Sequence, residues 1–117
     1  MNRFKELLVW QKAIDLAVEV YHITETLPKE ERYGLISQIN RSVISIPSNI
    51  AEGAGRNTSK EFNNFLGIAQ GSSFELDTQL IISNRLNFIS KEEYQNVELQ
   101  LEHIQNMIAK LKKSLNV

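Results

Sequence analysis

The clearest pattern of hydrophobic and polar positions lies in the last quarter of the chain. Apolar residues recur there at spacings of three and four, the period of one face of an α-helix. Ser90 is followed three residues later by Glu93, a pair typical of a capping box at a helix start. We therefore predict a helix from about residue 90. Its hydrophobic seam is made by Tyr94, Val97, Leu101, Ile104, Ile108, Leu111 and Leu115.

A second capping box, Thr58 followed by Glu61, predicts the start of another helix. This helix should run to about Leu86, with Asn87 in the turn after it. The small residues at 71–73, Gly-Ser-Ser, are poor helix formers, but they would let a neighbouring helix approach closely. The apolar positions are Phe62, Phe65, Leu66, Ala69, Leu76 and Leu80.

The first helix is predicted from about Glu6 to Thr26, and its apolar stripe is wider than one bundle core requires. One face carries Ala13, Leu16, Ala17, Val20 and either Ile23 or Thr24, and the stripe is widened by Trp10, Ile14, Val18 and Tyr21. A monomer would leave part of such a stripe exposed to water. We therefore take Trp10 and Tyr21 as candidate oligomer contacts.

The segment ISIPSNIAEGAGR, residues 44–56, allows two interpretations. A phosphate-binding loop would follow a β-strand and carry a longer glycine pattern, usually with a Lys-Ser or Lys-Thr pair. The apolar spacing through Val43, Ile46 and Ile50 is helical instead. We therefore interpret the segment as the end of a helix.

This second helix is predicted to begin near Pro28, where a first-turn proline is tolerated. Pro47 lies inside it and lacks the amide that would bond the carbonyl of Val43, so we expect a kink there. Gly53 and Gly55 would end the helix, with Gly55 the candidate for a left-handed C-terminal cap. The structural motif thus comprises Pro47, Asn49, Glu52, Gly53 and Gly55.

Four helices of about 20 residues with short connections predict an all-α fold. The expected architecture is an antiparallel up-down-up-down four-helix bundle, with its second helix kinked at Pro47. The 117 residues form a single domain, 1–117. The absence of cysteine excludes disulfides and cysteine-ligated zinc. No run approaches the roughly 18 to 20 apolar residues of a membrane-spanning helix, so we expect a cytoplasmic protein without a membrane partner.

Catalytic chemistry has little support in the spacing of the ionisable residues. A two-metal site in a helical bundle needs a Glu-x-x-His element on each of two helices. Glu19 and His22 form one such element, but the other histidine, His103, follows Gln100 at this spacing. A metal-binding helical-bundle enzyme is therefore the minor alternative, and we expect no cofactor.

Basic residues provide the other candidate site, although the net charge of -1 gives no global positive field. Lys12, Arg41, Arg56 and Lys60 are candidate contacts for nucleic acid or a protein partner, repeated by symmetry if the chain forms an oligomer. Scattered surface charges explain this set about as well. Arg56 can also pair with Glu52 at the i,i+4 spacing.

Three stretches together resemble a known family: residues 7–16 (LLVWQKAIDL), 30–56 (EERYGLISQINRSVISIPSNIAEGAGR) and 61–80 (EFNNFLGIAQGSSFELDTQL). They resemble the four-helix-bundle proteins encoded in bacterial 23S rRNA intervening sequences. The resemblance implies a ring-like homopentamer and no enzyme activity. A similar protein, the accessory variability determinant of diversity-generating retroelements, binds a reverse transcriptase and nucleic acid through a basic surface. Here Asn40 and Arg41 stand where that protein type has two arginines.

Two functional hypotheses follow from the sequence. The first is a non-catalytic, self-associating bundle that acts as an interaction scaffold for an RNA or ribonucleoprotein partner. The second is direct nucleic-acid binding through the basic residues, which must weaken steeply with salt.

Overall fold

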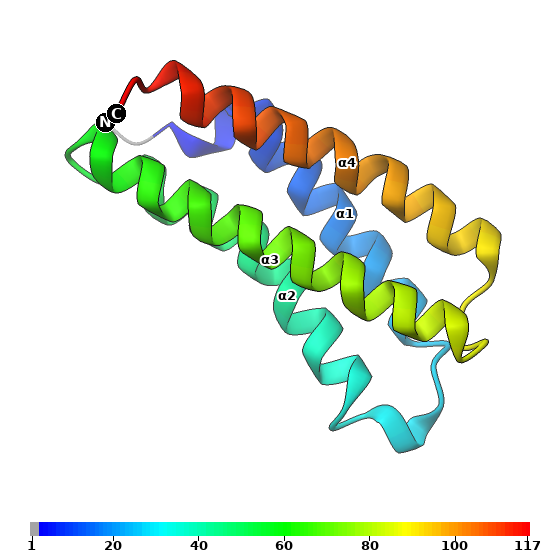
Figure 1. The fold of residues 1–117 in the computed structure, drawn as a ribbon. Helices are drawn as coiled ribbons and strands as arrows, with labels where there is room; N and C mark the ends of the chain where they lie inside the picture. The colour runs from blue at the N-terminus through cyan, green and yellow to red at the C-terminus, as the bar shows by residue number, and fades with distance from the viewer. Residues whose placement is uncertain (1–2) are drawn as a thin grey trace.

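The computed structural model describes residues 3–117, which form four α-helices and two short 3-10 turns. The helices are α1 (Leu8–Thr24), α2 (Leu35–Ala54), α3 (Ser59–Arg85) and α4 (Lys91–Ser114), and the 3-10 turns are η1 (Phe4–Glu6) and η2 (Lys29–Glu31) (Figure 1). Between residues 3 and 117 there is no β-strand, so the all-α prediction is confirmed.

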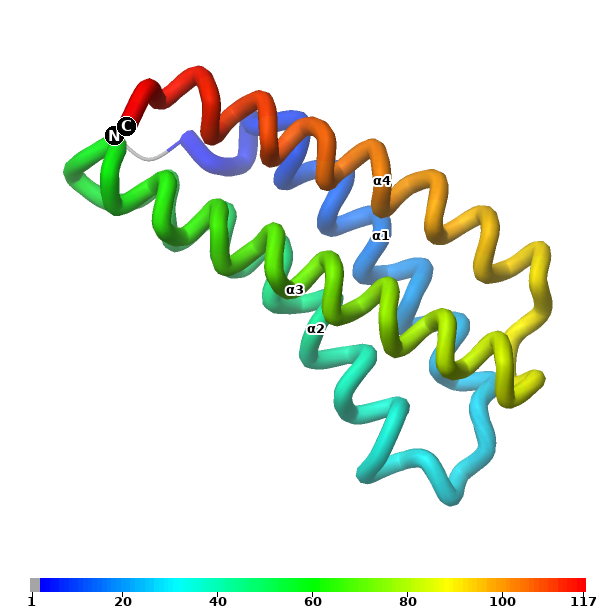
Figure 2. The backbone as a smooth tube through the Cα atoms, viewed as in Figure 1, coloured from blue at the N-terminus to red at the C-terminus, as the bar shows by residue number. Residues whose placement is uncertain are grey.

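Each helix packs against two others, which makes the four-helix bundle. Helix α1 contacts α2 and α4, and α3 contacts the same two helices. The two termini lie at one end of the bundle with the α2–α3 connection, and the other two connections lie at the opposite end (Figures 1 and 2). The up-down-up-down order expected for the four helices stays a prediction. The resulting body measures 43 × 23 × 20 Å.

The hydrophobic seam predicted near the C-terminus is the side of α4 that faces the core. Its central members are buried and its outer members are partly exposed: Val97, Leu101, Ile104 and Ile108, then Tyr94, Leu111 and Leu115. The other helices complete the core with large, fully buried side chains, among them Leu16, Ile39, Ile46, Leu66 and Leu76. Each such side chain stabilises the fold by about 1.5–3 kcal/mol relative to exposure.

Both predicted capping residues begin their helices, but with different hydrogen bonds. The Glu93 N–H donates to the Ser90 hydroxyl at 3.0 Å, and the Ser90 N–H donates to the Glu93 carboxylate at 2.8 Å, which completes the capping box. The Glu61 N–H likewise donates to the Thr58 hydroxyl at 3.1 Å, but the Glu61 carboxylate accepts from that hydroxyl instead of the N–H. Asn87, with φ 62°, lies in the predicted turn.

The second helix begins later than predicted. Pro28 has extended backbone angles, φ -56° and ψ 140°, and precedes the single turn η2. Helix α2 starts only at Leu35, after Gly34, a residue of low helix propensity. The Leu35 N–H donates to the Glu31 carboxylate at 3.3 Å, so the first turn of α2 is capped from η2 and does not continue it.

The end of α2 departs from the prediction at one glycine. Pro47 lies inside the helix, as predicted, and the bend expected there stays a prediction. Gly55 is right-handed, with φ -83° and ψ -3°, so the predicted left-handed cap is wrong. The reason is that the Gly55 N–H still donates to the Ala51 carbonyl at 3.2 Å and the Arg56 N–H to the Gly53 carbonyl at 3.1 Å. These bonds satisfy terminal carbonyls by a tightened right-handed turn.

The small residues at 71–73 in α3 lie in two different environments: Ser72 and Ser73 face the bundle, and Gly71 faces outward. The Ser72 hydroxyl lies 2.8 Å from the Ser45 hydroxyl of α2, and Ser73 is fully buried. Gly71 is exposed, and a Cβ built on it would meet no atom within 4 Å. For Gly71 the predicted close approach is therefore wrong within one chain, because its open side faces outward.

Candidate interaction surfaces

The motif at residues 44–56 joins the end of α2 to the start of α3. A Cβ added to Gly53 would lie 2.7 Å from the Phe65 Cβ and 2.9 Å from the Phe62 Cδ1, so this position needs the missing side chain. Arg56 lies 2.8 Å from the Glu52 carboxylate, which confirms the predicted pair, and its guanidinium stands 4.9 Å from the Phe65 ring centroid. The motif is thus architectural at this end of the bundle.

A row of polar side chains continues this contact along α2 and α3. The Asn49 amide donates to the Ser45 carbonyl at 2.8 Å and to its hydroxyl at 2.9 Å. Further along, the Ser42 hydroxyl lies 3.0 Å from both Glu75 and Gln79 of α3. Every buried polar side-chain atom in the described residues has a partner. The α2–α3 contact is therefore close and fully hydrogen-bonded.

A hydrophobic groove runs along the outside of α1 and α2, and we call it the apolar groove. Two shallow hollows of about 330 and 320 Å³ form it, and they are continuous because Ala17 and Ile44 line both. Three of its large side chains remain exposed to solvent: Val18 by 55%, Ile44 by 45% and Tyr21 by 40%. The apolar groove is lined mainly by Trp10, Ile14, Ala17, Val18, Tyr21, Ile44, Pro47 and Ala51, and the polar side chains of His22, Glu25 and Ser48 also line it.

The two candidate oligomer contacts therefore lie in the same groove. Trp10 is held at one end by an edge-to-face contact with Phe4, whose ring centroid is 5.2 Å away at an interplanar angle of 73°. Tyr21 lines the other hollow. The wide stripe that the sequence predicts for the first helix thus leaves an exposed apolar surface, and its contact with another copy stays a prediction.

A second exposed hydrophobic surface lies on α3, and we call it the outer face of α3. Its large side chains are between 36% and 54% exposed, and the open side of Gly71 lies on the same helix. The outer face of α3 consists of Ile68, Phe74, Ile81 and Ile82, together with Leu86 directly after the helix. The sequence pattern did not single out these residues, because they fall outside the heptad-like core positions.

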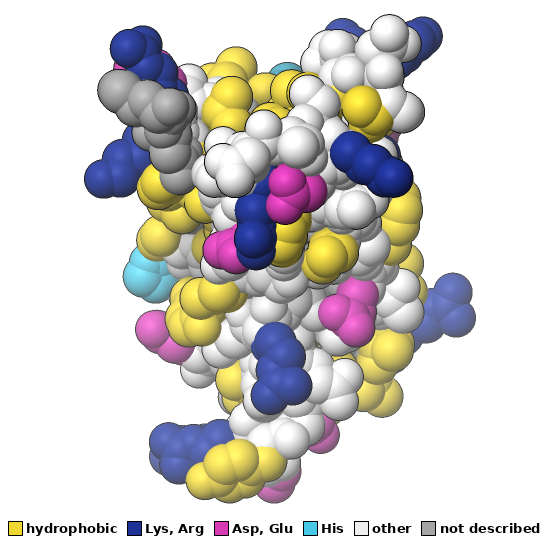
Figure 3. All heavy atoms as spheres, turned by 90° about the vertical axis from the view of Figure 1, so that its left-hand side faces the viewer, with side chains coloured by type: hydrophobic (Ala, Val, Ile, Leu, Met, Phe, Trp, Pro, Cys, Tyr) yellow, Lys and Arg dark blue, Asp and Glu magenta, His cyan; other side chains and the backbone are white. Residues whose placement is uncertain are grey.

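The candidate basic residues are not brought together within one chain. Lys12 lines a cleft between α1 and α4, whereas Arg41 is exposed on α2, which has no contact with α4 in the described structure. Lys60 is exposed in the first turn of α3, and Arg56 is paired with Glu52. Figure 3, which views the end that holds the termini, shows Lys and Arg side chains dispersed among apolar and acidic ones. A patch gathered by oligomer symmetry stays a prediction.

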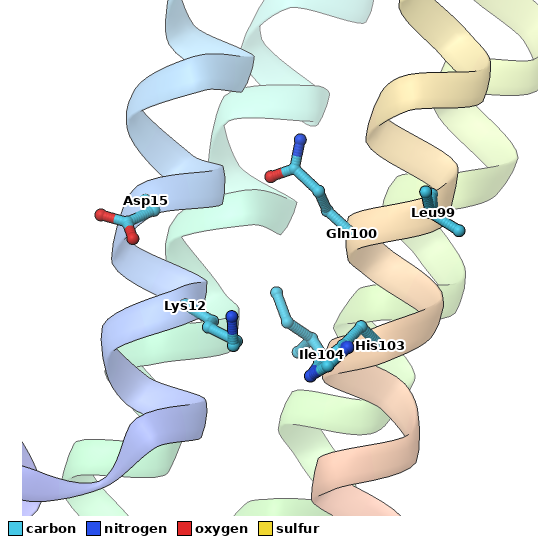
Figure 4. A pocket seen from close by; sticks show the side chains of 6 residues that line it. All are labelled: Lys12, Asp15, Leu99, Gln100, His103 and Ile104. Atoms are coloured by element: carbon cyan, nitrogen blue, oxygen red, sulfur yellow. The ribbon is translucent and has the colours of Figure 1, made fainter.

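The cleft between α1 and α4 has a volume of about 220 Å³. Lys12 extends from α1 and Gln100 from α4 into the space between the two helices, while the Asp15 carboxylate points away from α4 (Figure 4). Next to the cleft, the Glu19 carboxylate accepts hydrogen bonds from Asn96 at 2.9 Å and from Gln100 at 2.7 Å. Long polar side chains therefore bridge α1 and α4.

In the Glu-x-x-His element of α1, Glu19 contributes to the packing of α1 against α4. Glu19 is bonded to the two amides of α4, and His22 is exposed. Residues 3–117 contain no group of three or more His, Asp or Glu side chains placed to hold a metal ion. None of the helices in this range is long and apolar enough to cross a bilayer.

Sequence reasoning missed a polar cluster between α3 and α4. The Tyr94 hydroxyl donates toward Asp77 at 2.9 Å and toward Glu98 at 2.5 Å. Burial raises the pKa of Tyr94 above its ordinary value, and the hydrogen bonds to Glu98 and Asp77 raise it further. The seam pattern indicated the ring of Tyr94, but its partner Asp77 is 17 positions away and left no signal in the spacing.

Sequence reasoning also missed a pocket where α1, η2 and α2 meet, and we call it the corner pocket. It has a volume of about 420 Å³ and lies at the bundle end opposite the termini. Its lining includes the ring of Tyr21, the polar side chains of Thr24 and Asn40, and the cations of Lys29 and Arg32. These residues are spread over positions 21–40, so no short sequence motif indicates the pocket.

Comparisons with known proteins agree with this fold. The family model described as 23S rRNA-intervening sequence protein matches residues 5–110. A crystal structure of a protein with unknown function from the S23 ribosomal protein family of Bacteroides thetaiotaomicron VPI-5482 is similar to this chain, with a TM-score of 0.85 and 26% sequence identity. The similarity covers 91% of this chain and 99% of that one. No curated protein sequence matches the chain. Neither description states a catalytic activity.

Proposed function

The chain belongs to the 23S rRNA-intervening sequence protein family, and from that premise we propose that it is a non-catalytic, self-associating up-down-up-down bundle. In this proposal it acts in the cytoplasm as an interaction scaffold for an RNA or ribonucleoprotein partner. The observation that carries the proposal is the apolar groove, in which Val18, Tyr21 and Ile44 are 40–55% exposed. Continuous apolar surfaces of this kind mark contacts with other proteins more often than free surface.

The second apolar surface favours a head-to-tail assembly over a two-fold dimer. In a two-fold dimer the same patch meets itself, whereas two different patches on one chain allow each copy to bind the next. The apolar groove lies on α1 and α2, and the outer face of α3 lies on another helix. Gly71 leaves room on that helix for an incoming side chain. Repeated head-to-tail contacts close into a ring when the rotation permits, and the pentamer implied by the family resemblance is such a ring.

Light scattering on variants of purified protein tests self-association. We expect the wild type to have a mass of several chains, and Ile44→Glu to have the mass of one, because the change places a charge in the apolar groove. Leu99→Glu is the matched control, since Leu99 is 71% exposed on α4, away from the apolar groove. Circular dichroism verifies that both variants keep their helices. A monomeric wild type, or equal dissociation of both variants, would contradict the proposal.

Direct nucleic-acid binding is the second candidate function. The described residues contain two ion pairs, Arg3 with Glu6 and Arg56 with Glu52, so Lys12, Arg41 and Lys60 are free to meet phosphates. We expect structured RNA to be retained at low salt, to be released as salt rises, and to bind Arg41→Ala and Lys60→Ala less well. Binding that is insensitive to salt, or a wild-type oligomer that retains no RNA, would remove this candidate.

A further inference from the structure

The corner pocket combines three kinds of surface that a nucleotide needs. Its volume of about 420 Å³ falls within the usual range of ligand pockets, roughly 300–1,000 Å³. The ring of Tyr21, 40% exposed, forms part of its wall, and the aliphatic side chain of Ile36 lines it as well. A flat aromatic ring beside an aliphatic surface suits a stacked base, which is attracted to any aromatic face.

The polar groups inside the corner pocket leave one hydrogen-bonding atom free. The Thr24 hydroxyl lies 3.0 Å from the Asn40 Oδ1 and 3.0 Å from the Tyr21 carbonyl, so Thr24 engages one end of the Asn40 amide. Within the described residues, the Nδ2 end of this amide has no hydrogen-bond partner, and Asn40 lines the pocket. The free Nδ2 can only donate, and it therefore suits an acceptor atom on the polar edge of a base.

The cations of the corner pocket are also free. Lys29 and Arg32 are exposed, and neither forms an ion pair within the described residues. Arginine and lysine are the side chains that bind phosphate in proteins, arginine through its planar fork and lysine as a point charge. Glu25 is the carboxylate in the lining, and a carboxylate is a hydrogen-bond acceptor for ribose hydroxyls.

We infer that the corner pocket binds a ribonucleotide, with the base against Tyr21 and Asn40 and the phosphate on Lys29 and Arg32. The nucleotide can be free or can be an unpaired residue of an RNA chain, since both present the same base, ribose and phosphate. This inference goes beyond the self-association proposed above. It needs only one chain, because every group it uses lies within residues 21–40, although Tyr21 and Glu25 also line the apolar groove.

Calorimetric titration of the purified protein tests the inference with AMP, adenosine, inorganic phosphate and a single-stranded RNA of about eight nucleotides. We expect AMP to bind at least about tenfold more tightly than adenosine or phosphate, because it alone satisfies both halves of the site. RNA that binds more tightly than AMP identifies an RNA residue as the natural ligand, and RNA that binds no better identifies the free nucleotide. No binding of AMP at millimolar concentration would overturn the inference.

Paired charge removals separate the corner pocket from general electrostatics. The double variant Lys29→Ala and Arg32→Ala should weaken AMP binding by about tenfold or more. The matched control is Lys110→Ala with Lys113→Ala, which removes the same charge from two exposed positions near the end of α4. Equal weakening by both double variants would overturn the inference.

A third variant tests the base contact, and light scattering tests the oligomer independently. Asn40→Ala should change the ratio of AMP to UMP affinity while phosphate affinity stays the same, and an unchanged ratio would count against the site. Light scattering on the same samples reports self-association. AMP binding by a monomer would therefore sustain this inference while the proposed assembly fails, and an oligomer that does not bind AMP would show the reverse.

Discussion

The contact of α2 with α3 and the contacts of α4 with its neighbours use different physical means. Between α2 and α3 the backbones approach at Gly53, and short hydroxyl side chains such as Ser42 and Ser45 bridge the helices. Helix α4 instead packs its apolar seam into the core, and long polar side chains bridge it to α1 and α3. The first contact depends on the shape of particular small residues, and the second depends on hydrophobic spacing.

This difference explains why one part of the sequence is so distinctive. A heptad-like seam tolerates exchanges among apolar side chains of similar volume, because burial is roughly proportional to area. Gly53, which packs against the Phe62 ring and the Phe65 Cβ, has no such substitute. The residues of the motif at 44–56 are therefore harder to replace than those of the α4 seam, because the motif forms a close contact between α2 and α3.

The largest expected effect comes from adding one methyl group at each of two glycines in α2 and α3. Gly53→Ala should destabilise the fold by about 1–3 kcal/mol, because its Cβ would lie 2.7 Å from the Phe65 Cβ. Within one chain Gly71→Ala should stabilise the fold by roughly 0.5–1 kcal/mol, because the added Cβ meets no atom within 4 Å and alanine favours helix. Urea unfolding at one fixed protein concentration measures both. Equal effects of the two variants would show that α2 and α3 are not in close contact at Gly53.

The next effect concerns the polar bridge from α4 to α3. Tyr94→Phe removes the hydroxyl that contacts Asp77 and Glu98 and should lower the free energy of unfolding by about 1–2 kcal/mol at neutral pH. Because the pKa of Tyr94 is raised in the fold, the stabilisation by its neutral form is complete below the unfolded pKa of about 10 and is lost as pH rises above it. The difference between wild type and Tyr94→Phe should therefore shrink in alkali. A difference that is constant with pH would contradict this role.

The smallest expected effect concerns the bridge from α4 to α1. Glu19→Ala removes the acceptor of two amide hydrogen bonds. It should lower the free energy of unfolding by about 0.5–1.5 kcal/mol, since both hydrogen bonds are partly open to water. Glu102→Ala is the matched control, because Glu102 is exposed on α4 and has no hydrogen bond or ion pair in the described structure. Thermal unfolding compares the two variants. A loss as large as that of Gly53→Ala would mean that the polar bridge matters as much as the close contact.

The sequence predicted most of the fold because the helices obey local rules. Ser90 and Glu93 form their capping box from neighbouring residues, and the burial of Leu101 and Ile104 follows from their period. The conformation of Gly55 was predicted wrongly because the handedness of a helix end depends on which terminal carbonyls still need a hydrogen bond. The start of α2 escaped it because the Glu31 carboxylate, and not the first turn after Pro28, caps the helix.

The candidate sites were harder to predict because they depend on packing. Trp10 and Tyr21 were singled out from an overly wide stripe, and both line the apolar groove. The corner pocket joins Tyr21, Lys29 and Asn40 from three elements, and the tyrosine cluster joins Asp77 to Tyr94 across a turn. Neither arrangement has a spacing signature, since only the tertiary fold sets these distances.

Trp10, which the edge-to-face contact with Phe4 holds in place, is an intrinsic fluorescent reporter of the apolar groove. Trp10 is the only tryptophan in the chain, and it lines the end of the apolar groove. Its fluorescence therefore comes from one known position, without a label or an introduced cysteine. If another copy covers the groove, as we propose, water should leave the indole and its emission should move to shorter wavelength. Dilution series read at this single residue can follow assembly and disassembly in real time.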